Sequence, residues 1–209
     1  MADFPNALKR KPNIIVDASH FYRQPEWNRD AYRAFLREAE DRRFKQMAQS
    51  GIISSCQNIL DIGSGSTGSA FVNRLVKENK WVNPVYIDID LEGRIPKRVR
   101  GRCCEADAMS LPFRDESFDL AYAGGIIAGG IRDSSLYFWQ VNPYNLVAEA
   151  YRVLKPRGAL IFHVGKEMDR PATSRNLRDI GFTGIEHMIR RIYQDWWEDE
   201  YLARKAKNH

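Results

Sequence analysis

Acidic and small residues stand directly after several short apolar runs, where they could contact a small ligand. Asp61 ends the first of these runs, and a turn containing Gly63, Gly65 and Gly68 follows it. Beyond the turn, apolar residues recur with helical spacing. Glycines let the backbone approach a ligand closely, and the amides at a helix N-terminus can donate hydrogen bonds to it. Together with the carboxylate of Asp61, which can accept hydrogen bonds, the turn indicates a binding site for a small molecule.

The charge of Asp61 restricts which ligand suits this turn. The spacing Gly63-x-Gly65-x-x-Gly68, with Asp88 about twenty residues further on, matches the dinucleotide-binding fingerprint. In that fingerprint the helix N-terminus holds a pyrophosphate, which a carboxylate just before the first glycine would repel. A cationic nucleoside ligand therefore suits the turn better than a nicotinamide dinucleotide.

Apolar runs alternate with helical patterns along the chain, which indicates an α/β scaffold. We expect strands at residues 59–62, 85–90, 103–105, 118–123, 159–164, 185–193 and 200–205, and helices at 28–50, 71–76, 91–99, 143–154 and 173–180. This order predicts an open, doubly wound, mostly parallel sheet whose last strand pairs antiparallel. Ligands of such sheets lie beyond the carboxyl ends of the strands, at the switch point. Asp61, Asp88, Asp107 and Gly124 all fall at these ends, so we expect four loops to meet at one crevice.

The overall composition narrows the class of protein. A chain of 209 residues, 44% hydrophobic and 28% charged, is typical of a globular protein with one sizeable core. No segment has the length and hydrophobicity of a membrane span, and residues 1–12 lack the apolar centre of a signal peptide. Three cysteines suit neither a disulfide framework nor a zinc site, so we expect no metal and a cytoplasmic location. The net charge of +5 makes a nucleic-acid partner possible but does not indicate one.

The chain divides into two predicted parts. Residues 1–57 form an N-terminal tail with a helical lid or extension, and residues 58–209 form the domain that carries the site. Residues 20–27 are rich in aromatic side chains, and the helix expected after them is amphipathic. Two interpretations stay open: this helix packs on the sheet, or it is a lid that contributes aromatic side chains to a substrate pocket.

Three further motifs follow in a characteristic order. The run from Glu105 to Asp119 contains an acid, then Leu-Pro-Phe, then Ser-Phe-Asp; residues 153–158 read Val-Leu-Lys-Pro-Arg-Gly, and residues 202–205 read Leu-Ala-Arg-Lys. With Asp61-x-Gly63-x-Gly65, this order resembles the class I S-adenosylmethionine-dependent methyltransferases, closest to the small stand-alone type that acts mostly on small molecules. The resemblance implies a seven-stranded Rossmann-like sheet with an antiparallel last strand. It also implies S-adenosylmethionine as cofactor and methyl transfer to an oxygen, nitrogen or carbon atom, most often of a small molecule.

The resemblance assigns residues to the methionine end of the cofactor. Gly63, Ser64 and Gly65 would form the turn that approaches its methionine and ribose parts, and Asp61 would hold the methionine ammonium. Gly124 would place its carbonyl near the same end. The family pattern has a third glycine at the position that Thr67 occupies here. This chain departs from the pattern, because its own glycine stands one position later.

At the nucleoside end, the resemblance implies that Asp88 accepts hydrogen bonds from both ribose hydroxyls, with Ile89 beside it. Asp90 is the alternative ribose acid. Asp107 would accept a hydrogen bond from the adenine amino group, and the Ala108 amide would contact the ring edge. Asp107 could instead only cap a turn.

Some features of the sequence could also fit other functions. Tyr151-x-x-x-Lys155 has the spacing of the catalytic pair of a short-chain dehydrogenase, but Pro156 and Gly158 put it at a helix end. A non-catalytic methyltransferase-like subunit would not need the cofactor-binding acids. A basic run at residues 94–102 could instead serve an RNA or protein acceptor. The residues that could act as a general base, none of which stands out, are His20, Tyr22, Asp133 and His163. The sequence predicts neither a catalytic residue nor an oligomeric state.

Overall fold

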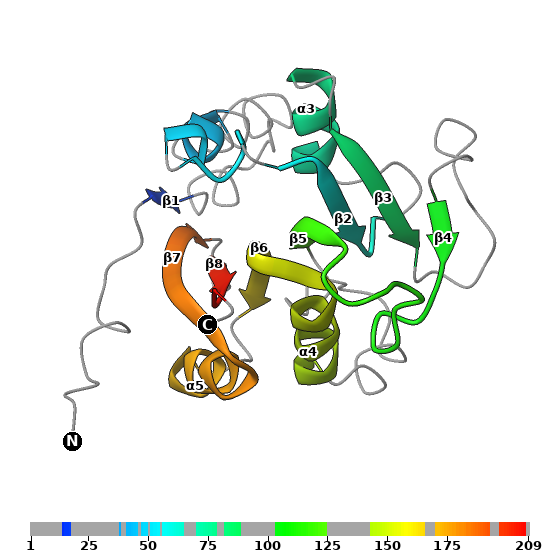
Figure 1. Cartoon of the computed structure of the whole chain (residues 1–209). Helices are drawn as coiled ribbons and strands as arrows, with labels where there is room; N and C mark the ends of the chain where they lie inside the picture. Colours follow the sequence, from blue (N-terminus) through cyan, green and yellow to red (C-terminus); the bar gives the residue numbers. More distant parts are fainter. Residues whose placement is uncertain are drawn as a thin grey trace.

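A computed structural model of the chain describes residues 14–17, 38, 41–45, 47–49, 51–54, 56–64, 70–78, 82–88, 103–124, 143–165, 170–192 and 197–207 (Figure 1). The helix expected at residues 91–99 lies outside these ranges, as do the aromatic residues 20–27. Among the described residues, no helix has the length and apolar character needed to cross a membrane.

One eight-stranded sheet organises the described part of the chain. Its strands, in the order in which they lie side by side, are β1 (Ile14–Asp17), β7 (Phe182–Ile192), β8 (Trp197–Lys205), β6 (Leu154–Gly165), β5 (Phe118–Ala123), β2 (Asn58–Ile62), β3 (Asn83–Asp88) and β4 (Cys103–Glu105). All neighbouring pairs are parallel except those of β8, which is antiparallel to both β6 and β7. The predicted sheet with an antiparallel last strand is confirmed, and β1 adds an eighth strand beside β7.

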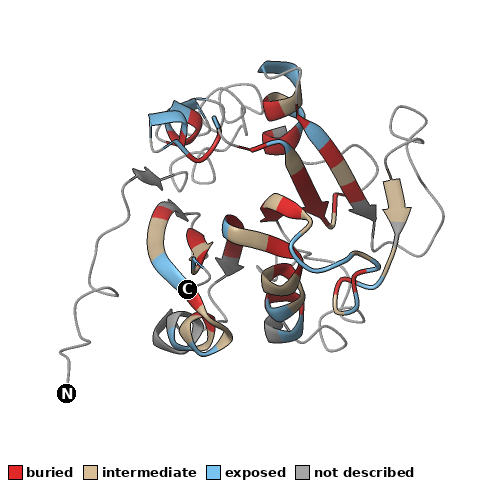
Figure 2. Ribbon diagram, viewed as in Figure 1, coloured by how far each residue is buried: buried red, intermediate tan, exposed pale blue. Residues whose placement is uncertain are grey.

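Helices cover both faces of this sheet. α3 (Ala70–Glu78) and helical residues in the range 38–49, here called the N-terminal helical segment, lie over one face, and α4 (Pro143–Val153) and α5 (Arg170–Ile180) lie over the other (Figure 1). Alternate residues of β2 enter the two cores: Ile59 packs under α3, and Leu60 faces the α4 side. The central strands are accordingly buried on both faces, as Figure 2 shows for β2 and β5.

The N-terminal helical segment is part of the core. Met47 is fully buried and Phe44 is 7% exposed, and both belong to the cluster that contains Phe71 of α3. Gly51, with φ +74°, follows this helix, and its amide bonds the carbonyl of Ala48, so the predicted helix end near residue 50 is confirmed. The described residues of the segment therefore pack on the sheet.

β6 begins earlier than expected. Pairing with β5 starts at Leu154 and resumes at Ala159 after a register shift, whereas the sequence predicted a helix end at residues 155–158 and a strand from residue 159. Arg157 takes a positive φ of 67° inside this bulge. A Cβ on Gly158 would lie 2.8 Å from the carbonyl oxygen of Lys155, so the bulge needs a glycine there. The strand expected from residue 159 therefore begins at Leu154 and passes through a bulge.

Candidate functional site

β2 carries a buried acid as its penultimate residue, and a sharp turn follows the strand. Asp61 is 1% exposed, and its Cα pairs with Tyr86 on β3 and with Tyr122 on β5. Gly63 follows with φ +70°, a conformation that other residues rarely adopt, and Ser64 is buried behind it. Gly65 lies outside the described residues. Since β2 and β5 are the neighbours at which the strand order reverses, this turn lies at the switch point of the sheet.

The next two predicted acids stand along the same edge. Asp88 is the last residue of β3 and pairs with Glu105, the last residue of β4. Its backbone therefore reaches the carboxyl edge, while Ile89 lies outside the described residues. Asp107 follows β4 and caps a turn: its Oδ1 accepts a hydrogen bond of 2.8 Å from the Met109 amide. The carboxylate is exposed, whereas Ala108 beside it is buried.

Arg152 of α4 clamps the loop that carries Asp107. Its guanidinium donates to the carbonyls of Leu111 and Phe113, at 2.9 and 2.8 Å, and to the carboxylates of Glu149 and Asp115. Glu149 in turn accepts a hydrogen bond from the Leu111 amide. Hydrogen bonds to Glu149 and Asp115 raise the pKa of Arg152, and the bond from Arg152 holds the pKa of Glu149 below its usual range against the effect of burial.

All five N–H donors of the Arg152 guanidinium are thus used. Sequence reasoning missed this residue. The one available signal is its spacing of three residues from Glu149 on a helix, and that spacing is common on solvated helix faces.

The Ser-Phe-Asp motif acts at the opposite edge of the sheet. Asp119, near the amino end of β5, accepts hydrogen bonds from the amides of Gln57 and Asn58, at 3.0 and 2.8 Å, and from Lys155 Nζ at 2.7 Å. Burial alone would raise the pKa of Asp119, but these hydrogen bonds outweigh it and hold that pKa below its usual range. Asp119 therefore anchors the entry to β2 and cannot contact a ligand at the carboxyl edge.

The same contact removes the dehydrogenase interpretation. Lys155 pairs with Asp119 at the amino edge, whereas the ring of Tyr151 packs edge-on against Phe182. α4 ends at Val153, so the two residues do not share a helix. They form no catalytic pair at the carboxyl edge.

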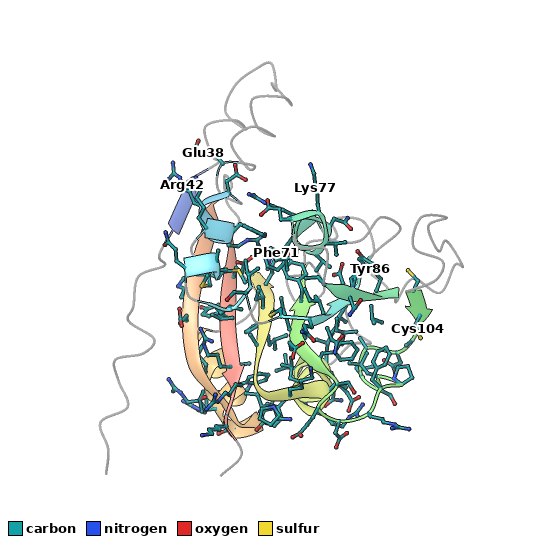
Figure 3. The ribbon with its side chains drawn as sticks, turned by 45° about the horizontal axis from the view of Figure 1, so that its top comes forward. Glu38, Arg42, Phe71, Lys77, Tyr86 and Cys104 are labelled. Atoms are coloured by element: carbon teal, nitrogen blue, oxygen red, sulfur yellow. The ribbon has the colours of Figure 1, made fainter. Side chains whose placement is uncertain are left out.

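Gly124, directly after β5, leaves room for Tyr122. A Cβ on Gly124 would lie 2.5 Å from Cε1 and 2.7 Å from the hydroxyl oxygen of Tyr122, so the tyrosine ring occupies the place of a side chain at residue 124. The other side of this ring stacks on Phe71 of α3, with ring centroids 5.0 Å apart. Figure 3 shows Phe71 pointing into the interior, while Lys77 of the same helix lies outside.

Tyr122 belongs to a closed set of side chains, here called the buried polar ring. The Tyr122 hydroxyl lies 3.3 Å from Nε2 of His163 on β6, and the same nitrogen lies 2.7 Å from Oε2 of Glu200 on β8. Arg43, from the N-terminal helical segment, forms a buried ion pair with that carboxylate. The Arg43 guanidinium also lies 4.7 Å from the centroid of the Phe71 ring, which closes the set.

The structure thus brings the described site residues to one edge in a definite order. Gly124 follows β5, Asp61 and Gly63 stand on either side of the last residue of β2, Asp88 ends β3 and Asp107 follows β4, and these four strands are consecutive neighbours. Of the four proposed general bases, His163 lies near this edge. His20, Tyr22 and Asp133 fall outside the described residues.

Comparison with known proteins agrees with this arrangement. Residues 60–162 match the model of a family described as a methyltransferase domain. Over these residues the chain resembles the class I methyltransferases. Among curated proteins, the chain is similar to the ubiquinone/menaquinone biosynthesis C-methyltransferase UbiE of Ruegeria sp., with 29% identity over 161 residues. The match covers 73% of the chain but only 60% of that relative.

Solved structures with the same fold include the 1,6-didemethyltoxoflavin-N1-methyltransferase of Burkholderia thailandensis. It matches with a TM-score of 0.56 and 16% identity over 82% of this chain and 78% of its own. The [4+2]-cyclase SpnF matches with a TM-score of 0.53 and 18% identity over 73% of the chain and 76% of its own. Because a cyclase shares the fold, these likenesses establish the fold and leave the reaction to be argued from the site.

Proposed function

We propose that this chain binds S-adenosylmethionine and transfers its methyl group to a small-molecule acceptor. The observation that carries the proposal is the buried Asp61 carboxylate beside the Gly63 turn at the switch point. A carboxylate removed from water suits a ligand that brings positive charge, and it repels one that brings a pyrophosphate. S-adenosylmethionine carries an ammonium and a sulfonium and has no phosphate, so its chemistry fits this turn.

Different residues of the carboxyl edge would bind different parts of the cofactor. Asp61 would hold the methionine ammonium, and Gly63 would let the backbone approach, with Ser64 and Gly65 in the same turn. Gly124 would lie toward the methionine end. At the other end, Asp88 and Ile89 would bind the ribose, and Asp107 with Ala108 the adenine. The Oδ1 atom of Asp107 is used by its own turn, so Oδ2 is the oxygen proposed for the adenine amino group.

The contribution of this chain to catalysis would be alignment and exclusion of water. When bound, the cofactor supplies a methyl group on a sulfonium, which is already an activated donor. Holding the acceptor in line with that methyl group supplies roughly 7 to 11 kcal/mol in well-oriented systems. A general base is needed where the acceptor atom must lose a proton.

The names of similar proteins support a small-molecule acceptor. One relative is named for ubiquinone and menaquinone biosynthesis, and one structural neighbour for 1,6-didemethyltoxoflavin. Both names denote small molecules that contain a ring. A ring-containing small-molecule acceptor is therefore proposed here.

The two parts of the chain would have different roles in this function. Residues 58–209 would bind the cofactor, since all four loops of the carboxyl edge belong to them. Residues 1–57 would cover the acceptor side, because their described helical residues pack on α3 and reach the carboxyl edge through Arg43. Limited proteolysis with and without S-adenosylhomocysteine tests whether residues 1–57 cover the site, and we expect the ligand to slow cleavage within residues 20–40. Unchanged cleavage would argue against this role.

Calorimetry tests the cofactor assignment directly. The full chain is titrated with S-adenosylmethionine, S-adenosylhomocysteine and NADH, and we expect the first two to bind and the third not to bind. Asp61→Asn should weaken binding of S-adenosylmethionine. Asp179→Asn, at an exposed aspartate of α5, is the matched control and should leave it unchanged. Binding of NADH without binding of either adenosyl ligand would overturn the proposal. Transfer of labelled methyl groups into fractionated cell extract would then identify the acceptor.

A further inference from the structure

The buried polar ring places ionisable groups from separate elements near the proposed transfer point. Arg43 and Glu200 are 1% and 0% exposed, and His163 is 8% exposed. His163, Glu200 and Tyr122 project from the same face of the sheet as Asp61, because their alternate neighbours Phe162, Tyr201 and Ala123 enter the opposite core. This face meets α3 and the N-terminal helical segment, and the ring lies near its carboxyl edge.

Packing alone does not account for such a ring. Taking an ion pair out of water costs several kcal/mol per ion, and apolar residues of similar volume often stabilise a core equally well or better. The neighbouring positions on the same face are apolar, among them Leu120, Ile161 and Leu202. Apolar side chains could therefore also fill the positions of the ring. Buried ionisable groups of this kind gather at functional sites.

Glu200 is shared between a fixed cation and a titratable ring. An ionised carboxylate only accepts hydrogen bonds, so the nitrogen 2.7 Å from it, Nε2 of His163, carries the hydrogen. In the neutral imidazole the basic lone pair is then on Nδ1. Arg43 compensates the charge of Glu200 from the other side. The net charge that His163 faces therefore depends on Arg43 as well as on Glu200.

The ring also lies close to where the methyl group would be delivered. Tyr122 contacts His163, and its hydroxyl is 2.7 Å from the position that a Cβ of Gly124 would take. The Cα of Tyr122 pairs with that of Asp61, the proposed partner of the methionine ammonium. The described groups that face His163 are Tyr122 on β5, Glu200 on β8 and Arg43 on the N-terminal helical segment. Asp61 on β2 pairs with Tyr122, and Asp199, which lies 3.0 Å from His187, is adjacent to Glu200 in the chain.

We propose that His163 accepts the proton of the methyl acceptor, and that Glu200 and Arg43 are positioning residues that set its protonation. This inference rests on the proposed function. Arg43 compensates the charge of Glu200, which favours the neutral imidazole that a base requires. Without the charge of Arg43, Glu200 would favour the imidazolium, which cannot accept a proton.

The proton balance of the step is simple. The acceptor atom loses its proton to the His163 imidazole, and the electron pair of that bond forms the new bond to the methyl group. The pair that held the methyl group stays with sulfur, which loses its positive charge. No oxidant, reductant or further reactant is needed.

Nuclear magnetic resonance of the full chain, labelled with ¹⁵N at its four histidines, tests the coupling without any acceptor. The His163 signal is assigned with His163→Gln. In Arg43→Met the titration midpoint of His163 should rise by about one pH unit or more, and in Glu200→Gln it should fall. Arg43→Lys keeps the charge and should stay near wild type. Shifts in opposite directions are the signature, because simple loosening of the core would move both variants the same way. An unchanged midpoint, or shifts of one sign, would overturn the proposal.

A ligand comparison tests the location. S-adenosylmethionine and S-adenosylhomocysteine share every charge except the sulfonium, so at saturation only the sulfonium distinguishes their effects. The His163 midpoint should be lower with the sulfonium ligand by about half a pH unit or more. Equal midpoints with both ligands bound would overturn this inference and leave the proposed function standing. Failure of both ligands to bind by calorimetry would overturn the two together.

Discussion

Replacing Arg152 with methionine should destabilise the loop that presents Asp107. Methionine keeps an unbranched apolar stem but removes all five hydrogen bonds of the guanidinium. The carbonyls of Leu111 and Phe113 lose charge-assisted donors, and each loss costs about 1 to 1.5 kcal/mol. The pair with Asp115, whose side chain is 71% exposed, adds about 0 to 1 kcal/mol. With the partly exposed Glu149 also released, the free energy of unfolding should fall by about 2 to 4 kcal/mol.

Urea unfolding at pH 7, followed by circular dichroism, measures this loss. Arg175→Met is the matched control, because Arg175 is an exposed arginine on α5. Arg152→Lys should fall between wild type and Arg152→Met, since an ammonium keeps the charge but cannot reproduce the planar fork. The methionine variant should also bind S-adenosylhomocysteine more weakly, because the loop holding Asp107 is less ordered. A stability within about 0.5 kcal/mol of the control would refute the clamp.

Three further perturbations test other contacts of the fold and the site. Asp119→Asn should lower the free energy of unfolding by about 1 to 3 kcal/mol at pH 7, with Asp179→Asn as control. The pKa of Asp119 is lower in the folded than in the unfolded protein. The stability difference between wild type and Asp119→Asn should therefore be complete above the unfolded pKa of about 3.9, and it should vanish as the pH falls through the folded pKa. A stability difference that does not change with pH would contradict this expectation. Gly124→Ala should displace the Tyr122 ring, costing about 1 to 3 kcal/mol and weakening S-adenosylhomocysteine binding, whereas wild-type stability and affinity would show that the ring does not lie there. Burial, and then the nearby charge of Asp119, raise the pKa of Cys56 to about 12, so mass spectrometry after iodoacetamide treatment at pH 8 should find it alkylated last of the three cysteines.

Local patterns were sufficient to predict the strands and turns that carry the cofactor-binding candidates. A run such as Ile59-Leu60 followed by Asp61 and Gly63 contains its own strand, end and turn, because apolar burial and the freedom of glycine at positive φ act within a few residues. The antiparallel β8 was likewise expected from its place at the end of the chain and from the family resemblance. The carboxyl-edge order of Asp61, Asp88 and Gly124 then followed from general rules of parallel sheets.

The tertiary structure alone decided what the charged residues do. Asp119 stood in a family motif, yet it caps amides about sixty positions earlier in the chain, at the edge away from the site. Arg152 reaches Leu111 across 41 positions. Arg43 and Glu200 are 157 positions apart, and their ion pair sets the surroundings of His163. A charged side chain carries no local pattern for its partner, because the partner is chosen by which elements the folded chain brings together and by how far each site is removed from water.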